Sequence, residues 1–296
     1  MTGRALAVAA AVSLFAAACL SISTPKPATP PVKRAFHPPN VKSIVVVVLE
    51  NTSPQHARAQ NFLGPLADTG VYFSNYSAVA HPSQPNYVAM VSGSFAGVRG
   101  DSRTRLNRPH LGRFLDSWTV YAEDYPGDTC NLSSTIKRYV RKHEPFASFA
   151  DVQDSVDFCK AHITGFESFA ADARNHRLPK FALVVPNLDH DGHDRPISEA
   201  DQWLEKNFAP LTDDPLFRRD VLLIVTFDEN DAKLSYIRRN ANNLVYTVFW
   251  GDSVIPGRVD DVYDHYDLLR TIEEILQVKP MADGDGNAVV IGGIWR

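Results

Sequence analysis

An unbroken run of apolar residues extends from Ile44 to Leu49, within the stretch "IVVVVLENTSP". Most of these residues are β-branched, and apolar and polar residues do not alternate. Such a run predicts a strand that is buried on both faces, which is typical of a parallel sheet flanked by helices. In open sheets of this kind the ligand site lies beyond the carboxyl ends of the strands. Glu50 and Asn51 follow this strand directly.

Similar apolar runs and helical patterns alternate along the rest of the chain. Helical spacing of apolar residues begins at Ser198 and at Tyr266, and residues 53–70 also have a helical pattern. We therefore predict an α/β fold, a three-layer sandwich with a mainly parallel central sheet flanked by helices. The further predicted strands are residues 118–123, 181–187, 221–228 and 244–250.

The composition is that of a globular protein without a strong overall charge. The chain has 296 residues, 44% of them hydrophobic, which is enough to bury a full core. The formal net charge of -4 provides no basic field for nucleic acid or anionic lipid, so we expect no nucleic-acid partner. No linker-like segment divides the chain after Val41, so residues 41–296 are predicted to form one domain.

The N-terminus has the pattern of an export signal. Residues 1–19 contain one Arg and then an apolar, Ala-rich stretch that is too short for a stable transmembrane anchor, so we predict a signal peptide. Small residues precede Cys19, as in a bacterial lipoprotein signal, although Ala16 replaces the more usual Leu. Residues 20–40 are Pro-rich and are predicted to form a linker. We expect a secreted or envelope-associated protein that contacts a membrane only through a lipid on Cys19.

Two cysteines are left once Cys19 is set aside, namely Cys130 and Cys159. An exported chain meets an oxidising compartment, so we predict that these two residues form a disulfide. The alternative, two buried thiols, would suit a cytosolic chain better.

Polar residues follow three of the predicted strands at the point where each strand ends. If the three ends meet at one sheet edge, their carboxylates repel each other unless a cation neutralises them. Oxygen and imidazole ligands suit Mg, Ca, Mn or Zn. The alternative is helix capping, because Asn51, Thr52 and Ser53 also favour N-cap positions. The three sets are Glu50 and Asn51; Asp189, His190, Asp191, His193 and Asp194; and Asp228 and Glu229.

A serine held between two prolines is the candidate nucleophile. In "AHPSQPNY", Pro82 and Pro85 bracket Ser83 and restrain the backbone, and a helix is predicted from Asn86. The positive end of a helix would stabilise an anion beside this hydroxyl. A surface turn without function is the alternative for this segment.

These segments together resemble the phosphoesterase family, which contains secreted acid phosphatases and bacterial phospholipases C within the alkaline-phosphatase-like superfamily. The similar segments are "VVVLENTS", "NYSAVAHPSQPNYVAMVSGS", "VPNLDHDGHD", "LLIVTFDEND" and "YDHYDLLRTIEEIL". The resemblance extends from Ser43 to Val278 and is greatest to the shorter, phosphatase-type members.

The resemblance implies roles for particular residues. Glu50 and Asn51 would bind metal and phosphate, and Asp228 and Glu229 would complete the site of a divalent metal ion. Ser83 would be the nucleophile. The Asn51 and Asn86 amides would donate hydrogen bonds to phosphate, and His193 would protonate the leaving alkoxide. Asp194, His190 and His265 are further residues expected near the substrate.

We therefore expect an exported, metal-dependent phosphatase that hydrolyses small phosphate monoesters through a serine nucleophile. The first alternative is a phospholipase C that acts on phosphodiesters. The alternative of another class is a non-catalytic protein that binds phosphate ligands.

Overall fold

The computed structural model describes residues 34–126, 129–231 and 243–296. The predicted signal peptide, Cys19 and residues 20–33 of the predicted linker lie outside the described residues. Residues 34–40 pack against the C-terminal segment. Gly293 donates its backbone N–H to the Ala35 carbonyl, and the Phe36 ring meets the Trp295 ring edge to face.

An eight-stranded sheet forms the centre of the molecule, with strand order β11-β2-β10-β9-β1-β8-β4-β7. Strands β9, β1, β8, β4 and β7 are parallel neighbours, whereas β10 is antiparallel to β9 and β2. The prediction of a mainly parallel sheet is therefore confirmed. The strands are β1 (Ser43–Leu49), β2 (Val71–Phe73), β4 (Trp118–Ala122), β7 (Ile163–Gly165), β8 (Phe181–Val185), β9 (Val221–Phe227), β10 (Thr247–Trp250) and β11 (Gly257–Val259).

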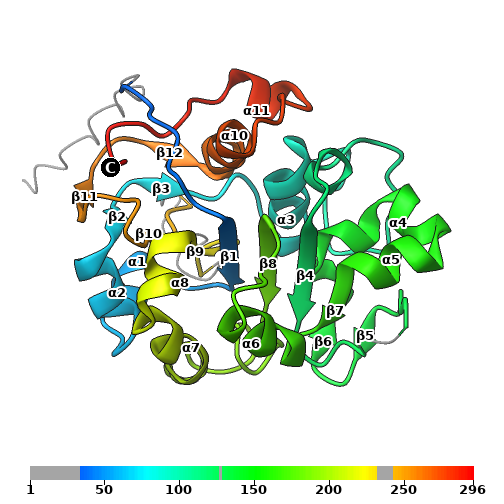
Figure 1. The fold of residues 1–296 in the computed structure, drawn as a ribbon. Helices are drawn as coiled ribbons and strands as arrows, with labels where there is room; N and C mark the ends of the chain where they lie inside the picture. Colours follow the sequence, from blue (N-terminus) through cyan, green and yellow to red (C-terminus); the bar gives the residue numbers. More distant parts are fainter. Residues whose placement is uncertain (1–33, 127–128, 232–242) are drawn as a thin grey trace, which may run out of the picture.

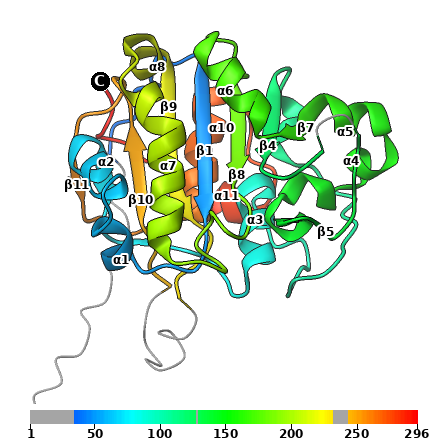
Figure 2. The ribbon, with the colours of Figure 1, turned by 90° about the horizontal axis from the view of Figure 1, so that it is seen from below.

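Helices cover both faces of the sheet, which gives the predicted three layers. Figure 1 shows α3 (Ser83–Ser92) and α10 (His265–Leu276) above the sheet, and α6 (Glu167–Arg174) and α7 (Ile197–Thr212) below it; α8 (Pro215–Asp220) follows α7 in the chain. In the turned view of Figure 2, α7 runs in front of the strands and α10 behind them. Val46 and Val48 of β1 lie with Leu268 and Ile272 of α10 around one small apolar space. Apolar side chains on both faces of β1 are thus buried, as its unbroken apolar pattern requires.

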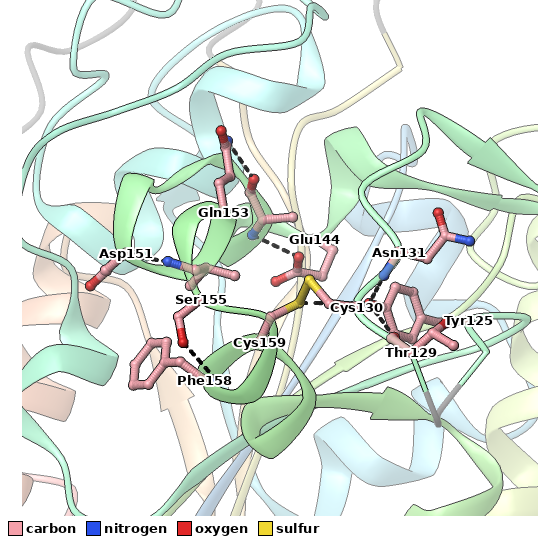
Figure 3. The surroundings of a disulfide bond; sticks show 12 residues. Tyr125, Thr129, Cys130, Asn131, Glu144, Asp151, Gln153, Ser155, Phe158 and Cys159 are labelled. Atoms are coloured by element: carbon pink, nitrogen blue, oxygen red, sulfur yellow. Dashed lines mark hydrogen bonds between the residues drawn. A yellow bond between two sulfur atoms is a disulfide. The ribbon is translucent and has the colours of Figure 1, made fainter.

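A long insertion between β4 and β7 carries the disulfide. Cys130 and Cys159 are bonded, with their Cα atoms 5.5 Å apart, which confirms the predicted pairing (Figure 3). In the same region, the Glu144 carboxylate accepts hydrogen bonds from the backbone N–H groups of Phe146 and Ala147. The elements of the insertion are β5 (Thr135–Ile136), β6 (Tyr139–Val140), η2 (Arg141–His143), η3 (Pro145–Ser148), α4 (Ala150–Asp154) and α5 (Val156–His162).

Two predicted helices differ from the observed ones. The helix expected over residues 53–70 is two helices, α1 (Pro54–Arg58) and α2 (Leu63–Thr69). The chain breaks between them because the buried Asp201 carboxylate accepts the N–H groups of Phe62 and Leu63. The helix expected from Asn86 begins at Ser83 instead. A proline is tolerated in a first helical turn, where its missing N–H has no partner to lose.

Four short elements complete the structure. They are β3 (Tyr76–Ser77) and β12 (Tyr263–Asp264), which pair in parallel, η1 (Leu111–Phe114), and α11 (Asp283–Asn287). Across the described ranges, no helix combines the length and the apolar character needed to cross a membrane.

Candidate active site

The three polar strand ends meet at one edge of the sheet. β1 lies between β8 and β9, and all three strands run in the same direction. Glu50 donates its backbone N–H to the Asp191 carbonyl over 2.8 Å, and Asp228 donates its own to the Leu49 carbonyl over 2.9 Å. The side chains of Glu50, Asp191 and Asp228 are all buried. The parallel register therefore produces a buried cluster of carboxyl groups.

Ser83 lies in this cluster as the first residue of α3. Its Oγ donates a hydrogen bond to Glu50 Oε2 over 3.1 Å, and the same hydroxyl lies close enough to Asp228 to oppose the rise in the pKa of that carboxyl group. The residue is 2% exposed. Ser83 thus combines a helix N-terminus with two carboxylates that can orient its hydroxyl and accept its proton.

The four polar residues after β1 divide into two pairs with different functions. Asn51 has a left-handed backbone with φ of 51°, which Asn tolerates better than most residues, and its Nδ2 lies 3.3 Å from Glu50 Oε2. Thr52 bonds back to the Glu50 carbonyl, and Ser53 caps α1 by accepting the N–H of His56. The capping interpretation is confirmed for Ser53, whereas Glu50 and Asn51 lie at the carboxyl cluster.

The sequence analysis missed two residues that contact Glu50. Tyr87 Oη donates to Glu50 Oε1 over 2.8 Å, and His143 Nε2 lies 3.1 Å from the same oxygen. His143 Nδ1 also lies 3.3 Å from Asp191 Oδ2, and the His143 ring stacks on Tyr87. Tyr87 follows Ser83 by one helical turn, a spacing that indicates a shared face. His143 carries no local signal, because the insertion brings it to the site.

Asn86 does not face the site, contrary to the prediction that its amide binds phosphate. Its Oδ1 accepts the N–H groups of Val79 and Ala80, and its Nδ2 donates to the carbonyls of Ala80 and Pro82. The amide is completely used in holding the turn that leads into α3. Asn86 therefore positions Ser83 rather than the substrate.

His265 also lies behind the site rather than in contact with a substrate. It is completely buried, its Nε2 bonds to the Asp228 carbonyl over 2.8 Å, and its Nδ1 bonds to Tyr76 Oη over 3.1 Å. Both ring nitrogens are therefore hydrogen-bonded within the protein, and the side chain holds the backbone of Asp228 in place.

The histidines of the loop after β8 point in different directions. The His193 ring lies 5.9 Å from the ring of His143, and its Nδ1 bonds to Asp194 Oδ1 over 2.7 Å. His190 instead bonds to both oxygens of Glu123 and stacks on Trp203. The structure thus brings His193 toward the site and draws His190 away from it.

Asp194 and Glu229 occupy the margins of the site. Asp194 contacts the His193 ring and forms an ion pair with Arg138. These two side chains hold its carboxylate in place. Glu229 is buried and lies against the His81 ring. One Glu229 oxygen therefore contacts His81, while the carboxylate as a whole lies close enough to Asp228 to act on its pKa.

Burial shifts the pKa values of the ionisable groups in the cluster. It raises the pKa of Glu50, an effect that His143 opposes, and it raises the pKa of Asp228 well above the ordinary value, with Glu50 and Glu229 adding to the shift. Burial also raises the pKa of Asp191 to about 7 and lowers the pKa of His143 to about 4. His143 is therefore neutral near pH 7, and the carboxyl groups need a compensating charge to ionise together.

The donor atoms have the chemistry of a divalent-cation site. Within the described ranges, Asp228 Oδ2 is buried without a hydrogen-bond partner, and the buried His143 nitrogens and Asp191 Oδ2 make no well-aligned hydrogen bond despite the 3.1 Å and 3.3 Å contacts of His143 with Glu50 and Asp191. Carboxylate oxygen and neutral imidazole are common ligands of divalent metals. In the same part of the chain, no three His, Cys, Asp or Glu side chains are spaced to hold one ion. The chemistry of these atoms fits a cation, and Ser83 and Asn51 would have to supply further oxygen ligands.

Comparison with known proteins agrees with these features. Residues 56–279 match the model of the Phosphoesterase family. A probable acid phosphatase of Kluyveromyces lactis is 34% identical over 267 residues, covering 84% of this chain and 62% of that protein. A phosphatidylinositol-3-phosphatase of Mycobacterium tuberculosis is 31% identical over 267 residues, covering 87% of this chain and 84% of that protein. The chain spans about 60% of the length of the yeast relative.

Solved structures show the fold at low sequence identity. A protein of the alkaline phosphatase superfamily from Vibrio parahaemolyticus aligns with a TM-score of 0.59 and 14% identity, covering 88% of this chain and 72% of that one. The lipoteichoic acid synthase LtaP of Listeria monocytogenes aligns with a TM-score of 0.53 and 14% identity, covering 82% of this chain and 75% of that one. The chain has an alkaline-phosphatase-like fold and belongs to the Phosphoesterase family.

Proposed function

We propose that the protein is an exported phosphatase that hydrolyses phosphate monoesters, with Ser83 as the nucleophile and a divalent cation as cofactor. One observation carries the proposal: Ser83 Oγ, at the start of α3, bonds to Glu50 and lies beside Asp228 in a buried carboxyl cluster. The family and the relatives named acid phosphatases support the class of reaction.

The reaction is a double displacement at phosphorus. The Ser83 hydroxyl gives its proton to a neighbouring carboxylate as its oxygen attacks, and the bond between phosphorus and the leaving alcohol breaks as the new bond forms. Water then attacks the phosphoserine and releases phosphate. The N-terminal end of α3 favours the negative charge of the phosphoryl group at Ser83.

The residues that would hold the cation are Glu50, Asn51, Asp228 and Glu229, with His143 and Asp191 as further donors from the described site. When bound, a divalent ion lowers the pKa of a coordinated hydroxyl and neutralises phosphate charge. His143 and Tyr87 hold the Glu50 carboxylate in place from the opposite side.

His193 is proposed to protonate the leaving oxygen. Its Nδ1 is bonded to Asp194, which orients the ring. Asp194 is in turn fixed by Arg138. Asn51 is the amide that would donate to phosphate, because the Asn86 amide is already used. Asn86 and His265 act as positioning residues for Ser83 and Asp228.

The alternatives receive less support from the structure. A phospholipase C would benefit from an exposed apolar rim, but the large exposed apolar side chains of the described residues lie on elements that contribute nothing to the site. These are Phe114, Val156, Leu216 and Ile255. A non-catalytic phosphate-binding protein would not need a serine oriented by two carboxylates. Export is supported by the Cys130–Cys159 disulfide, which suits an oxidising compartment.

Substitution of Ser83 tests the proposal. Ser83→Ala should lower the single-turnover rate on a phosphate monoester by several orders of magnitude, on the order of 5 kcal/mol in barrier. Ser92→Ala is the matched control, because Ser92 is buried in the same helix and its Oγ bonds only to backbone carbonyls. Acid-quenched wild type should yield a phosphoserine on the Ser83 peptide. An alanine variant with more than about a tenth of the wild-type rate would instead indicate direct attack by water.

A further inference from the structure

We propose that a cavity beside Ser83 binds the leaving group, and that it selects phosphate monoesters whose alcohol part carries its own negative charge. The inference rests on the proposed function and deepens it by naming a substrate class. It depends on the position of the cavity, on its charges and on a buried guanidinium group without a full set of partners.

Gln84, the residue that follows Ser83 in the chain, lines the cavity. The cavity has a volume of about 330 Å³ and is lined by Gln84 of α3, by Asp101 and Arg103, and by Arg141 and Lys142 of η2. The Gln84 N–H donates to Asp101, and the Gln84 side chain accepts the N–H of Ser102. These bonds fix one wall of the cavity to the first turn of α3. Ser83 and this wall of the cavity are therefore adjacent in the first turn of α3, and the alcohol part of the substrate is assigned to this space.

The second wall joins the cavity to the carboxyl cluster. Lys142 lines the cavity, whereas the next residue, His143, contacts Glu50. The cationic side chain of Lys142 therefore stands next in the chain to the imidazole that contacts Glu50.

The cavity carries an excess of positive charge. Lys142 and Asp101 form an ion pair at 2.9 Å and neutralise each other. Arg103 and Arg141 form no ion pair with a carboxylate of the described chain. Arg103 donates to the Leu132 carbonyl and is otherwise exposed, so its remaining N–H groups are available to a ligand.

Arg141 provides a second, independent indication of a ligand. It is 6% exposed, and its Nη2 donates to the carbonyls of Thr104 and Ala147. Its buried Nε has no hydrogen-bond partner among the residues that the structure describes. Arg141 lines the cavity and adds a positive charge to its wall, which favours an anionic group there. A carboxylate or a second phosphate on the leaving alcohol has the required charge.

Two substrates that differ by one charge test the inference, namely phenyl phosphate and 3-carboxyphenyl phosphate. In Arg103→Gln, kcat/KM for the carboxylated ester should fall about fivefold further than kcat/KM for phenyl phosphate, as expected for one partly exposed charge pair. Arg103→Lys should restore most of the selectivity. Arg174→Gln is the matched control, because Arg174 is exposed at the end of α6 and does not line the cavity. Equal losses for both esters in Arg103→Gln would overturn the inference.

Binding to the inactive variant separates this inference from the proposed function. Calorimetry on Ser83→Ala should show tighter binding of 3-carboxyphenyl phosphate than of phenyl phosphate, and the added Arg103→Gln substitution should remove the difference. If the wild type hydrolyses neither ester but this preference is present, the proposed function fails and the cavity assignment stands. If both esters are hydrolysed and Ser83→Ala binds them equally, the cavity assignment fails and the proposed function stands.

Discussion

Ser83 Oγ and Glu50 Oε2 are joined by a hydrogen bond of 3.1 Å, which links the start of α3 to the end of β1. Tyr87, one helical turn after Ser83, holds the other oxygen of the same carboxylate at 2.8 Å. Two residues of α3 thus donate hydrogen bonds to the two oxygens of one carboxyl group at the sheet edge. The candidate nucleophile and the carboxyl cluster therefore form one rigid unit, and changes to either should affect both.

Removal of divalent metal should abolish phosphatase activity. Buried carboxyl groups at Glu50, Asp191 and Asp228 cannot all ionise without a compensating charge. Chelation followed by gel filtration should give an inactive protein that regains activity with added divalent ion, and elemental analysis should follow the same course. Full turnover by protein shown to be free of metal would contradict this prediction.

The two histidines after β8 should differ in their effect on activity. His193→Ala should lower kcat about 10²-fold or more for substrates with poor leaving groups, as expected for loss of a general acid. His190→Ala is the matched control and should retain near wild-type kcat, because His190 is bonded to Glu123 away from the carboxyl cluster. Steady-state kinetics with alkyl and aryl phosphates would measure both. Equal losses in the two variants would argue against the proposed role of His193.

Asn86→Ala should destabilise the protein by about 2–4 kcal/mol, because its buried amide makes four hydrogen bonds to the backbone before α3. It should also lower kcat by misplacing Ser83. Asn207→Ala provides a control, since that amide has one bond, to the Trp203 carbonyl, and should cost less than about 1 kcal/mol. Urea unfolding would measure both variants. An Asn86→Ala protein with wild-type stability and kcat would show that the turn does not depend on this amide.

Loss of the disulfide should reduce stability more than catalysis. The bond closes a separation of 29 residues, worth roughly 3 kcal/mol in the chain-entropy model. Unfolding of the Cys130→Ser, Cys159→Ser double variant should need less urea than unfolding of the oxidised wild type. Added reductant should lower the urea concentration at the unfolding midpoint of the wild type and leave that of the double variant unchanged. A wild-type midpoint insensitive to a reductant that is shown to open the bond would contradict the prediction.

Glu273 should make stability fall as the pH rises. Burial raises the pKa of Glu273 to about 9, and a hydrogen bond to Asp285 adds to the shift. Asp285 accepts the N–H groups of Met281, Ala282 and Gly286, so Glu273 must supply the proton between the two carboxyl groups. A raised acid pKa favours the folded state below the ordinary value of 4.5, and this contribution is lost as the pH rises toward 9.

Substitution of Glu273 by Gln should remove that pH dependence, because the amide donates to Asp285 at any pH. The melting temperature of Glu273→Gln should therefore increase relative to wild type between pH 5 and pH 9, by a few degrees. Glu274→Gln is the control, since Glu274 is 42% exposed and pairs with Arg270. Parallel pH profiles for wild type and Glu273→Gln would refute the shared-proton arrangement.

Local patterns of residues are enough to predict the sheet and the carboxyl cluster at its edge. Apolar runs such as Ile44 to Leu49 can be satisfied only by burial on both faces, and neighbouring parallel strands necessarily bring their carboxyl ends together. Glu50 and Asp228 directly follow such runs, so their convergence follows from local pattern. The Cys130–Cys159 pairing was equally accessible, because only one pairing was left.

Which polar groups are left free to bind a ligand depends on the folded chain, because a donor or acceptor can be used by a partner far away in the sequence. The Gln84 N–H is taken by Asp101, which allows α3 to begin at Ser83. The His190 ring is hydrogen-bonded to Glu123. His143, which lies in the insertion between β4 and β7, contacts Glu50. Each of these partners lies at least 17 residues away, the shortest separation being that of Gln84 and Asp101, so no local pattern could reveal them.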